Sequence, residues 1–321
     1  MATFTFFGGK GGVGKTTVSS AFALRSARGG NRTLLVSTDP AHSTADVFDQ
    51  PLSDEPSSID GIEGLDAMEI DPSEEVENHR KEIRRQLGQQ LSAAMVNEIS
   101  MQLEMAHQTP GAHEAALFDR FIDVMRDHDP YDRVVFDTSP TGGTLRLLSL
   151  PELLEQWIDR LLYKREKSIE NFERAAIGNR QPRRMMEGDP IIDRLKERKE
   201  RFAFAGKALR TGATFHLVLN PDSLSIRETR RAVDALQSAE LGVEGLIVNR
   251  LTPGPDPEEN GRGARYLRDR VETEQERLDE IHDSFDVPVV AEIETYVREV
   301  KGDILETVAD ELEIEPQSAT P

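Results

Sequence analysis

The stretch FFGGKGGVGKTTVSS, residues 6–20, places five glycines and two lysines between an apolar run and a series of small hydroxyl residues. It contains the pattern G-x-x-x-x-G-K-[ST], whose fixed positions are Gly9, Gly14, Lys15 and Thr16. In such a loop the glycines let successive backbone N–H groups point at phosphates, the lysine reaches the outer phosphates, and the hydroxyl binds Mg²⁺. The stretch therefore predicts a site for a nucleoside triphosphate.

The residues on either side of this loop support the same prediction. Residues 3–7 alternate and are β-branched or aromatic, which is typical of a strand. Residues 17–24 predict a helix, whose positive N-terminus would face the bound anion. A strand, a glycine-rich loop and a helix in this order favour a phosphate site over the alternative of an accidental glycine-rich turn.

Lys10 is a second lysine in the loop, five residues before Lys15. From that position it cannot easily reach the outer phosphates of its own nucleotide, so we expect it to point outward. The sequence K-G-G-V-G-K-T-T resembles the deviant Walker A class of P-loop ATPases, in which the early lysine reaches across a dimer to the nucleotide of the other subunit. The alternative is a solvated loop lysine.

Length and composition set the outer bounds. The chain's 321 residues suffice for one large α/β domain or a core with a subdomain, and 37% hydrophobic residues can bury a substantial interior. No apolar run approaches the roughly 18 residues of a membrane span, and the N-terminus lacks the pattern of a secretion signal. These features predict a cytoplasmic protein. The absence of cysteine excludes disulfides and any thiolate site.

The charge balance is strongly acidic. The net charge is −20, and lysine supplies only 9 of the 39 basic residues. An acidic surface repels phosphate-rich partners, so nucleic acid is not an expected partner. The same composition favours the hypothesis of a halophilic protein, because a Debye length of about 3 Å at 1 M salt would screen the self-repulsion.

Two apolar runs deliver an aspartate to one edge of the predicted sheet. Residues 33–37 predict a buried strand that leads to Asp39. Residues 134–136 lead to Asp137, a combination that holds Mg²⁺ or its waters opposite a phosphate loop. Ligand sites of open parallel sheets lie at the carboxyl ends of the strands, so both side chains are candidates for the nucleotide site.

About seven strands of this kind alternate with helical stretches, the others lying in LDAMEIDP, TFHLVLNPDS, VEGLIVNRL and VPVVAEI. The alternation predicts an α/β fold with a doubly wound, mostly parallel sheet. Helical patterns interrupt the strands at 73–128 and 151–212. We therefore expect a P-loop ATPase core of residues 1–72, 129–150 and 213–321, with an inserted α-helical subdomain.

Four motifs in order, GGKGGVGKTT, STDPAHS, AMEIDPS and DTSPTGGTLRLL, give the chain a resemblance to the ArsA family. That family includes arsenite-pump ATPases and ATPases that target tail-anchored membrane proteins. The resemblance covers nearly the whole chain. It implies a nucleotide-hydrolysing core interrupted by a helical subdomain, and two subunits that face each other across two ATP molecules.

The resemblance also implies roles for individual residues. Asp39 would orient the attacking water, although a helix N-cap is the alternative. Such a carboxylate suits phosphoryl transfer, which depends on alignment more than on a strong base. Thr16 and Asp137 would hold Mg²⁺, the latter through water, and Lys10 would complete the partner's site. The implied nucleotide-binding set is Gly9, Lys10, Gly11, Gly12, Val13, Gly14, Lys15, Thr16, Thr17 and Asn249, and the implied switch residues are Pro40, His42, Pro140, Gly142 and Gly143.

Asn249 bears on the choice of base. GTP-binding proteins usually carry an Asn-Lys-x-Asp motif after a late strand, and this chain has VNRLTPG there. A lone asparagine after a strand is as often a turn residue. The resemblance matches Asn249 to the family's adenine-facing asparagine, which favours ATP.

Methionines suggest a surface for apolar partners. Leu91, Met95, Ile99 and Leu103 repeat every four residues and predict one core-facing stripe. Met101 and Met105 fall on a second face, and flexible methionine suits varied hydrophobic partners. The predicted client groove comprises Met95, Met101, Met105, Met185 and Met186. Ordinary subdomain core or a dimer contact is the alternative, while targeting members of the family present a methionine-rich groove here.

The chain departs from the family at two places. Eukaryotic targeting members carry a Cys-x-x-Cys pair that clamps zinc between subunits, and this chain has none, so no zinc is expected. Gly143 replaces a histidine that is usual in the second switch. Arsenite is held by soft thiolates, and the lack of cysteine therefore argues against a metalloid pump.

The leading prediction is an ATP- and Mg²⁺-dependent targeting ATPase. Its expected partners are a second copy of the chain, hydrophobic transmembrane segments and a membrane receptor that the sequence does not identify. The alternatives are a general holdase ATPase and a deviant Walker A positioning or partitioning switch. A positioning or partitioning switch would be expected to carry a basic amphipathic tail, whereas the C-terminal residues 306–321 are acidic.

Overall fold

The computed structural model describes residues 3–38, 43–71, 112–138, 158–164, 166–167, 190–312 and 314. They contain an eight-stranded sheet in the order β3-β4-β2-β5-β1-β6-β7-β8. The strands are β1 (Thr3–Gly9), β2 (Thr33–Ser37), β3 (Ser57–Ser58), β4 (Leu65–Glu69), β5 (Arg133–Asp137), β6 (Ala213–Leu219), β7 (Val243–Leu251) and β8 (Val289–Glu294).

All neighbouring strands pair in parallel except β3 with β4. The central strand β1 lies between β5 and β6, with Phe6 beside both Phe136 and Phe215. These three rings stack in the core, and all are nearly inaccessible to solvent. Apolar runs buried on both faces are typical of parallel strands, which explains why the sequence pattern identified them. The predicted doubly wound α/β fold is confirmed.

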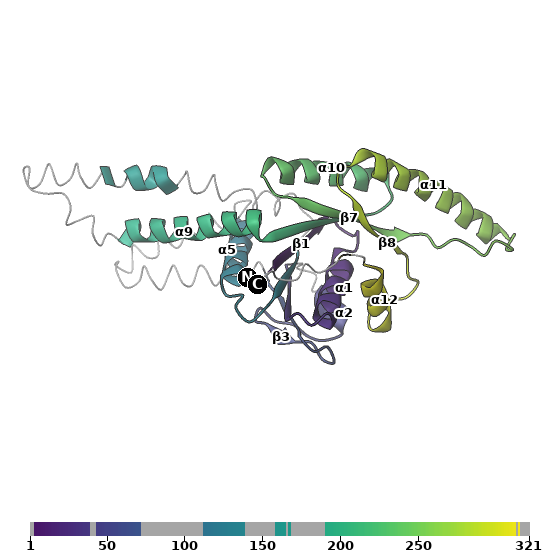
Figure 1. Cartoon of the computed structure of the whole chain (residues 1–321), viewed down its shortest axis with the longest axis horizontal. Helices are drawn as coiled ribbons and strands as arrows, with labels where there is room; N and C mark the ends of the chain where they lie inside the picture. The colour runs from purple at the N-terminus through teal and green to yellow at the C-terminus, as the bar shows by residue number, and fades with distance from the viewer. Residues whose placement is uncertain are drawn as a thin grey trace, which may run out of the picture.

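Helices cover both faces of the sheet (Figure 1). They are α1 (Lys15–Arg28), α2 (Ser43–Phe48), α5 (Ala112–Arg126), α9 (Pro190–Thr211), α10 (Ser223–Ser238), α11 (Arg262–Ser284) and α12 (Asp303–Glu311). One core contains α1 and α12, represented by Phe22 and Val308. The opposite core contains α5, α9, α10 and α11, represented by Phe121, Leu209 and Leu278.

Helices α5 and α9 lie within the stretches that the sequence assigns to the helical subdomain. Their buried residues Phe118 and Phe202 stack on each other, with ring centroids 6.1 Å apart, in the core beneath the sheet. Arg201 also binds Asp123 across the two helices at 2.8 Å. At least these segments therefore pack on the ATPase core. The remaining parts of the division, residues 72–111, 139–157, 165 and 168–189, lie outside the described residues.

Within the described ranges, no helix combines the length and the apolarity that crossing a bilayer requires.

Candidate functional site

The loop after β1 has a backbone that only glycine accommodates. Gly9, Gly12 and Gly14 have φ values of 143°, 80° and 93°. A Cβ on Gly9 would lie 2.2 Å from the carbonyl oxygen of Val218 in β6. The loop therefore combines left-handed dihedral angles with a close approach to the neighbouring strand, which explains the glycine-rich sequence.

The N-terminus of α1 is open to an anion. Its N-cap residue is Gly14, which has no side chain to bond the first N–H groups, and the first turn has no acidic residue. Helix α10 differs, because Asp222 accepts hydrogen bonds from Leu224 N at 3.0 Å and Ser225 N at 2.8 Å. Uncapped N–H groups and the positive end of the helix dipole suit a phosphate.

The two lysines of the loop lie close together. Lys15 is 8% exposed, and its Nζ donates a hydrogen bond to the carbonyl oxygen of Lys10 at 3.2 Å. Its positive charge thus lies over the loop backbone at the start of α1. The side chain of Lys10 is half-buried, and its predicted reach to a second subunit stays a prediction.

Thr16 and Asp137 meet at the ends of α1 and β5. Thr16 Oγ1 donates a hydrogen bond to Asp137 Oδ2 at 2.6 Å, and Asp137 is only 1% exposed. The backbone next to this aspartate is also fixed, since Thr138 Oγ1 donates to Phe7 O at 2.9 Å. A hydroxyl and a carboxylate oxygen side by side are hard ligands of the kind that Mg²⁺ prefers.

Asn249 closes the loop from the side of β7. Its Nδ2 donates a hydrogen bond to Val13 O at 2.7 Å, and its Oδ1 accepts one from Arg250 N at 2.9 Å. The residue is 8% exposed. The structure therefore brings Asn249 to the phosphate loop, although its contact is with the protein backbone.

The family model described as anion-transporting ATPase matches residues 2–313. The chain belongs to the anion-transporting ATPase family. The resemblance to the ArsA family is thereby confirmed, and with it the prediction of ATPase activity.

This ATPase is similar to relatives with two kinds of name. It is 34% identical to a protein of Aquifex aeolicus that is named as a candidate arsenical pump-driving ATPase, over 87% of this chain and 88% of the relative. It is 32% identical to ATPase ASNA1 homolog 1 of Paramecium tetraurelia, over 92% and 88% of the two chains. It is 31% identical to the ATPase get3 of Pyrenophora tritici-repentis, over 92% and 86%.

The residues of the ATPase fit a nucleotide with Mg²⁺. Glycines at 9, 12 and 14 leave the loop backbone without side chains at these positions, and the first turn of α1 has no side-chain cap. The Lys15 ammonium lies over this loop, where it donates to the Lys10 carbonyl. Thr16 and Asp137 supply oxygen ligands beside this turn. The arrangement can hold phosphates and a hard cation together.

Glu69 is a residue of this ATPase that the sequence analysis missed. It ends β4 and is 5% exposed, and its Oε1 accepts hydrogen bonds from Thr44 N at 3.0 Å and Ala45 N at 2.9 Å. A carboxylate is favourable at the N-terminus of a helix, here α2. Glu69 thereby fixes the first turn of α2, which begins four residues after Asp39. Its place at the end of a buried strand was the signal available in the sequence.

Several predicted site residues lie outside the described residues. They are the water-orienting Asp39, the switch residues Pro40, His42, Pro140, Gly142 and Gly143, and the client-groove residues Met95, Met101, Met105, Met185 and Met186. Their roles stay predictions. The strands that lead toward Asp39 and toward Pro140, β2 and β5, pair with each other, with Ser37 beside Asp137.

Proposed function

We propose that this ATPase is a dimeric, ATP-driven switch that captures hydrophobic transmembrane segments in the cytoplasm and targets them to a membrane. The observation that carries the nucleotide part is the contact of Thr16 with Asp137 at the open N-terminus of α1. Similarity to the ASNA1 and get3 ATPases over most of both chains supports the targeting part. The resemblance to the ArsA family, whose members include ATPases that target tail-anchored proteins, supports it as well.

The chain's own residues divide the work of hydrolysis. The loop amides and Lys15 would hold and orient the phosphates, and Thr16 would hold the cation together with Asp137, the latter through water. A bound Mg²⁺ would neutralise charge that develops on the phosphates. Asp39 orients the attacking water, and Lys10 completes the site of the second copy. Phosphoryl transfer needs alignment and electrostatic stabilisation more than covalent chemistry, which this set of residues suits.

Pumping of arsenite is the less favoured function, despite the name of the relative from Aquifex aeolicus. Trivalent arsenic binds soft thiolate ligands, and the sequence contains no cysteine. A chain of this composition would need a different kind of ligand. Hydrophobic segments need only an apolar surface, for which the five client-groove methionines are the candidates.

The test compares wild type with Asp39→Asn, each with and without a soluble protein fused to one transmembrane helix. We expect the wild type to form a dimer with ATP, to capture the fusion protein and to change its ATPase rate on capture. Asp39→Asn should still capture it but hydrolyse ATP at least about 100-fold more slowly. Asp49→Asn is the matched control, because Asp49 is an exposed carboxylate beyond α2.

Three results would contradict the proposal. The first is an ATPase rate that does not respond to the transmembrane helix. The second is a wild type that remains monomeric at saturating ATP. The third is that the ATPase protects an unfolded soluble protein from aggregation as well as it protects the fusion with a transmembrane helix. That result would indicate a general holdase instead.

A further inference from the structure

The chain forms a strained corner where β7 ends, next to the phosphate loop. In the pairing of β7 with β8, Val248 lies beside Glu292 and Leu251 beside Glu294, so one extra residue is accommodated in β7. Arg250 lies in this irregular step with a φ of 65°, which a residue with a side chain rarely adopts. Such bulges re-aim side chains near active sites.

The side chain re-aimed by this corner is that of Asn249. Both ends of its amide are used, Nδ2 on Val13 O and Oδ1 on Arg250 N, so the amide has one defined orientation. In a trans peptide the C=O and the following N–H point in opposite directions. By holding the Val13 carbonyl, Asn249 therefore turns the N–H of Gly14 away from itself.

Pairing with β8 does not fix the corner, because its two inner residues, Asn249 and Arg250, lie between the paired positions of β7. The carboxylate of Glu274 on α11 fixes the end of this corner through hydrogen bonds. Glu274 Oε2 accepts a hydrogen bond from Thr252 N at 2.7 Å, and Glu274 Oε1 accepts one from Thr252 Oγ1 at 2.9 Å. Thr252 follows Asn249 by three residues. Both hydrogen bonds are made to a charged acceptor, which strengthens them.

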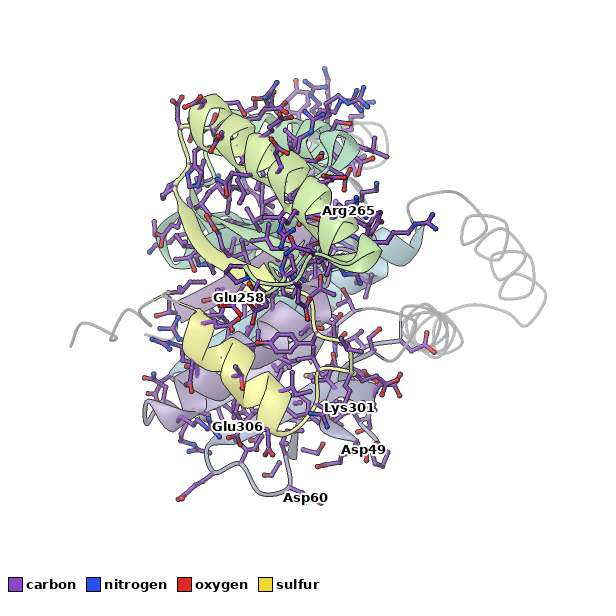
Figure 2. The ribbon with its side chains drawn as sticks, turned by 90° about the vertical axis from the view of Figure 1, so that its right-hand side faces the viewer. Asp49, Asp60, Glu258, Arg265, Lys301 and Glu306 are labelled. Carbon is purple, nitrogen blue, oxygen red and sulfur yellow. The ribbon has the colours of Figure 1, made fainter. Side chains whose placement is uncertain are left out.

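Glu274 is unusual among the acidic residues of α11 because it is only 8% exposed. Figure 2 shows this helix running across the face of the molecule, with Arg265 in its N-terminal part and Glu258 in the preceding loop. The carboxylate is held from its own helix by Arg270 Nε at 2.8 Å. Burial alone would raise the pKa of Glu274, but the hydrogen bonds from Arg270 and Thr252 outweigh it and lower the pKa. The group thus stays ionised at neutral pH.

We propose that Glu274 is a positioning residue of the nucleotide site: it fixes Thr252, and with it the strained corner that aims Asn249 at the Val13 carbonyl. The ligand served is a nucleoside triphosphate or diphosphate bound by the loop from Gly9 to Thr17, so the inference rests on the proposed nucleotide site. Glu274 touches no nucleotide. It acts by keeping the Val13–Gly14 peptide in the orientation that the phosphate loop needs.

The test measures the Kd of a fluorescent ADP analogue and, in nucleotide-free protein, the hydrogen exchange of the amides from Val13 to Thr17. Glu274→Ala should raise the Kd about 10-fold, which corresponds to about 1.4 kcal/mol, and should speed the exchange of these amides. Glu274→Gln keeps one acceptor oxygen and should fall between Glu274→Ala and wild type. Glu276→Gln, an exposed carboxylate of the same helix, should match wild type.

A double-mutant cycle with Asn249→Ala tests the route of the effect. If Glu274 acts through Asn249, the double variant should bind the analogue no more weakly than Asn249→Ala alone. Thr252→Val removes only the hydroxyl and should reproduce part of the Glu274→Ala effect, which keeps the test possible if Glu274→Ala does not fold.

Two outcomes would overturn the inference. One is a Glu274→Ala protein with a lower Tm but wild-type affinity and exchange, which would make the carboxylate a general stabiliser of α11. The other is multiplication of the Glu274→Ala and Asn249→Ala effects on Kd. Neither readout uses a client or hydrolysis, so an ATPase indifferent to transmembrane helices would leave this result standing.

Discussion

Thr16 at the start of α1 and Asp137 at the end of β5 are 121 positions apart in the chain, and their side chains are joined by a hydrogen bond of 2.6 Å. The bond joins the Thr16 hydroxyl to the carboxylate of the last residue of β5, the strand beside β1. Hydroxyl and carboxylate oxygens are donors that hard cations prefer, and we propose that this pair marks the cation site of the ATPase.

Substitution of Asp137 tests this assignment. Asp137→Asn removes the charge but keeps the size, and we expect kcat for ATP to fall by about 10²–10³-fold, with a higher Mg²⁺ concentration needed for half-maximal rate. Asp129→Asn, an exposed aspartate in the turn before β5, is the control and should behave as wild type. An unchanged Mg²⁺ dependence in Asp137→Asn would remove the assignment.

Two glycines of the loop separate backbone strain from steric clash. A Cβ on Gly14 would lie 2.2 Å from Asn249 Nδ2, whereas a Cβ on Gly12 would meet no atom within 4 Å. Both residues have positive φ, so each alanine costs about 1–2 kcal/mol of strain. Gly14→Ala must also displace the Asn249 amide, and we expect it to lower the unfolding free energy of nucleotide-free protein by about 3 kcal/mol or more. If Gly12→Ala and Gly14→Ala lowered the unfolding free energy in urea by the same amount, the Asn249 amide would be shown to move aside without cost.

The sequence predicts the phosphate loop and the parallel strands well because both signals are local. The glycine spacing of residues 9–14 reports the backbone angles directly, and strands such as β5 are apolar runs buried on both faces. The antiparallel strand β3 was missed because two residues carry no periodic pattern.

Long-range contacts explain what the sequence does not reveal. Glu274 is one of several acidic residues of α11, and nothing in its neighbours marks it as the one that binds Thr252, 22 positions earlier. The resemblance to the ArsA family assigned Asn249 to adenine. Its bond to Val13 was not predicted, because that bond requires β7 and the phosphate loop to be placed together. The roles of Asp39 and of the client-groove methionines stay predictions.

The acidic surface predicts a salt-dependent stability. With a net charge of −20, the folded chain is destabilised by self-repulsion, which reaches about 10 Å at 0.1 M salt and about 3 Å at 1 M. We expect the Tm to rise as KCl is increased from 0.1 M to 1 M. The double variant Glu258→Gln, Glu259→Gln, in the exposed loop before α11, should reduce the salt dependence. If the Tm in dilute buffer equalled the Tm in 1 M KCl, the hypothesis of a halophilic protein would be wrong.

His216 predicts a pH dependence of stability. It lies in β6 at 4% exposure, stacked on Phe7 with ring centroids 5.5 Å apart. Burial, with a smaller effect of the positive charge of Arg133, lowers the pKa of His216 to about 4 from 6.5. Between these two pH values the unfolded chain binds a proton at this histidine and the folded chain does not. The unfolding free energy should therefore fall by about 1.4 kcal/mol for each pH unit below 6.5, and level off below pH 4.

The contribution of His216 can be isolated by difference. His216→Gln carries no titrating group, so the free energy of unfolding in urea should depend less steeply on pH than that of wild type, by about one proton between pH 4.5 and 6. If His216→Gln and wild type lose stability in parallel, His216 is protonated in the folded state at these pH values, and the packing of Phe7 and Arg133 around it does not exclude the charge.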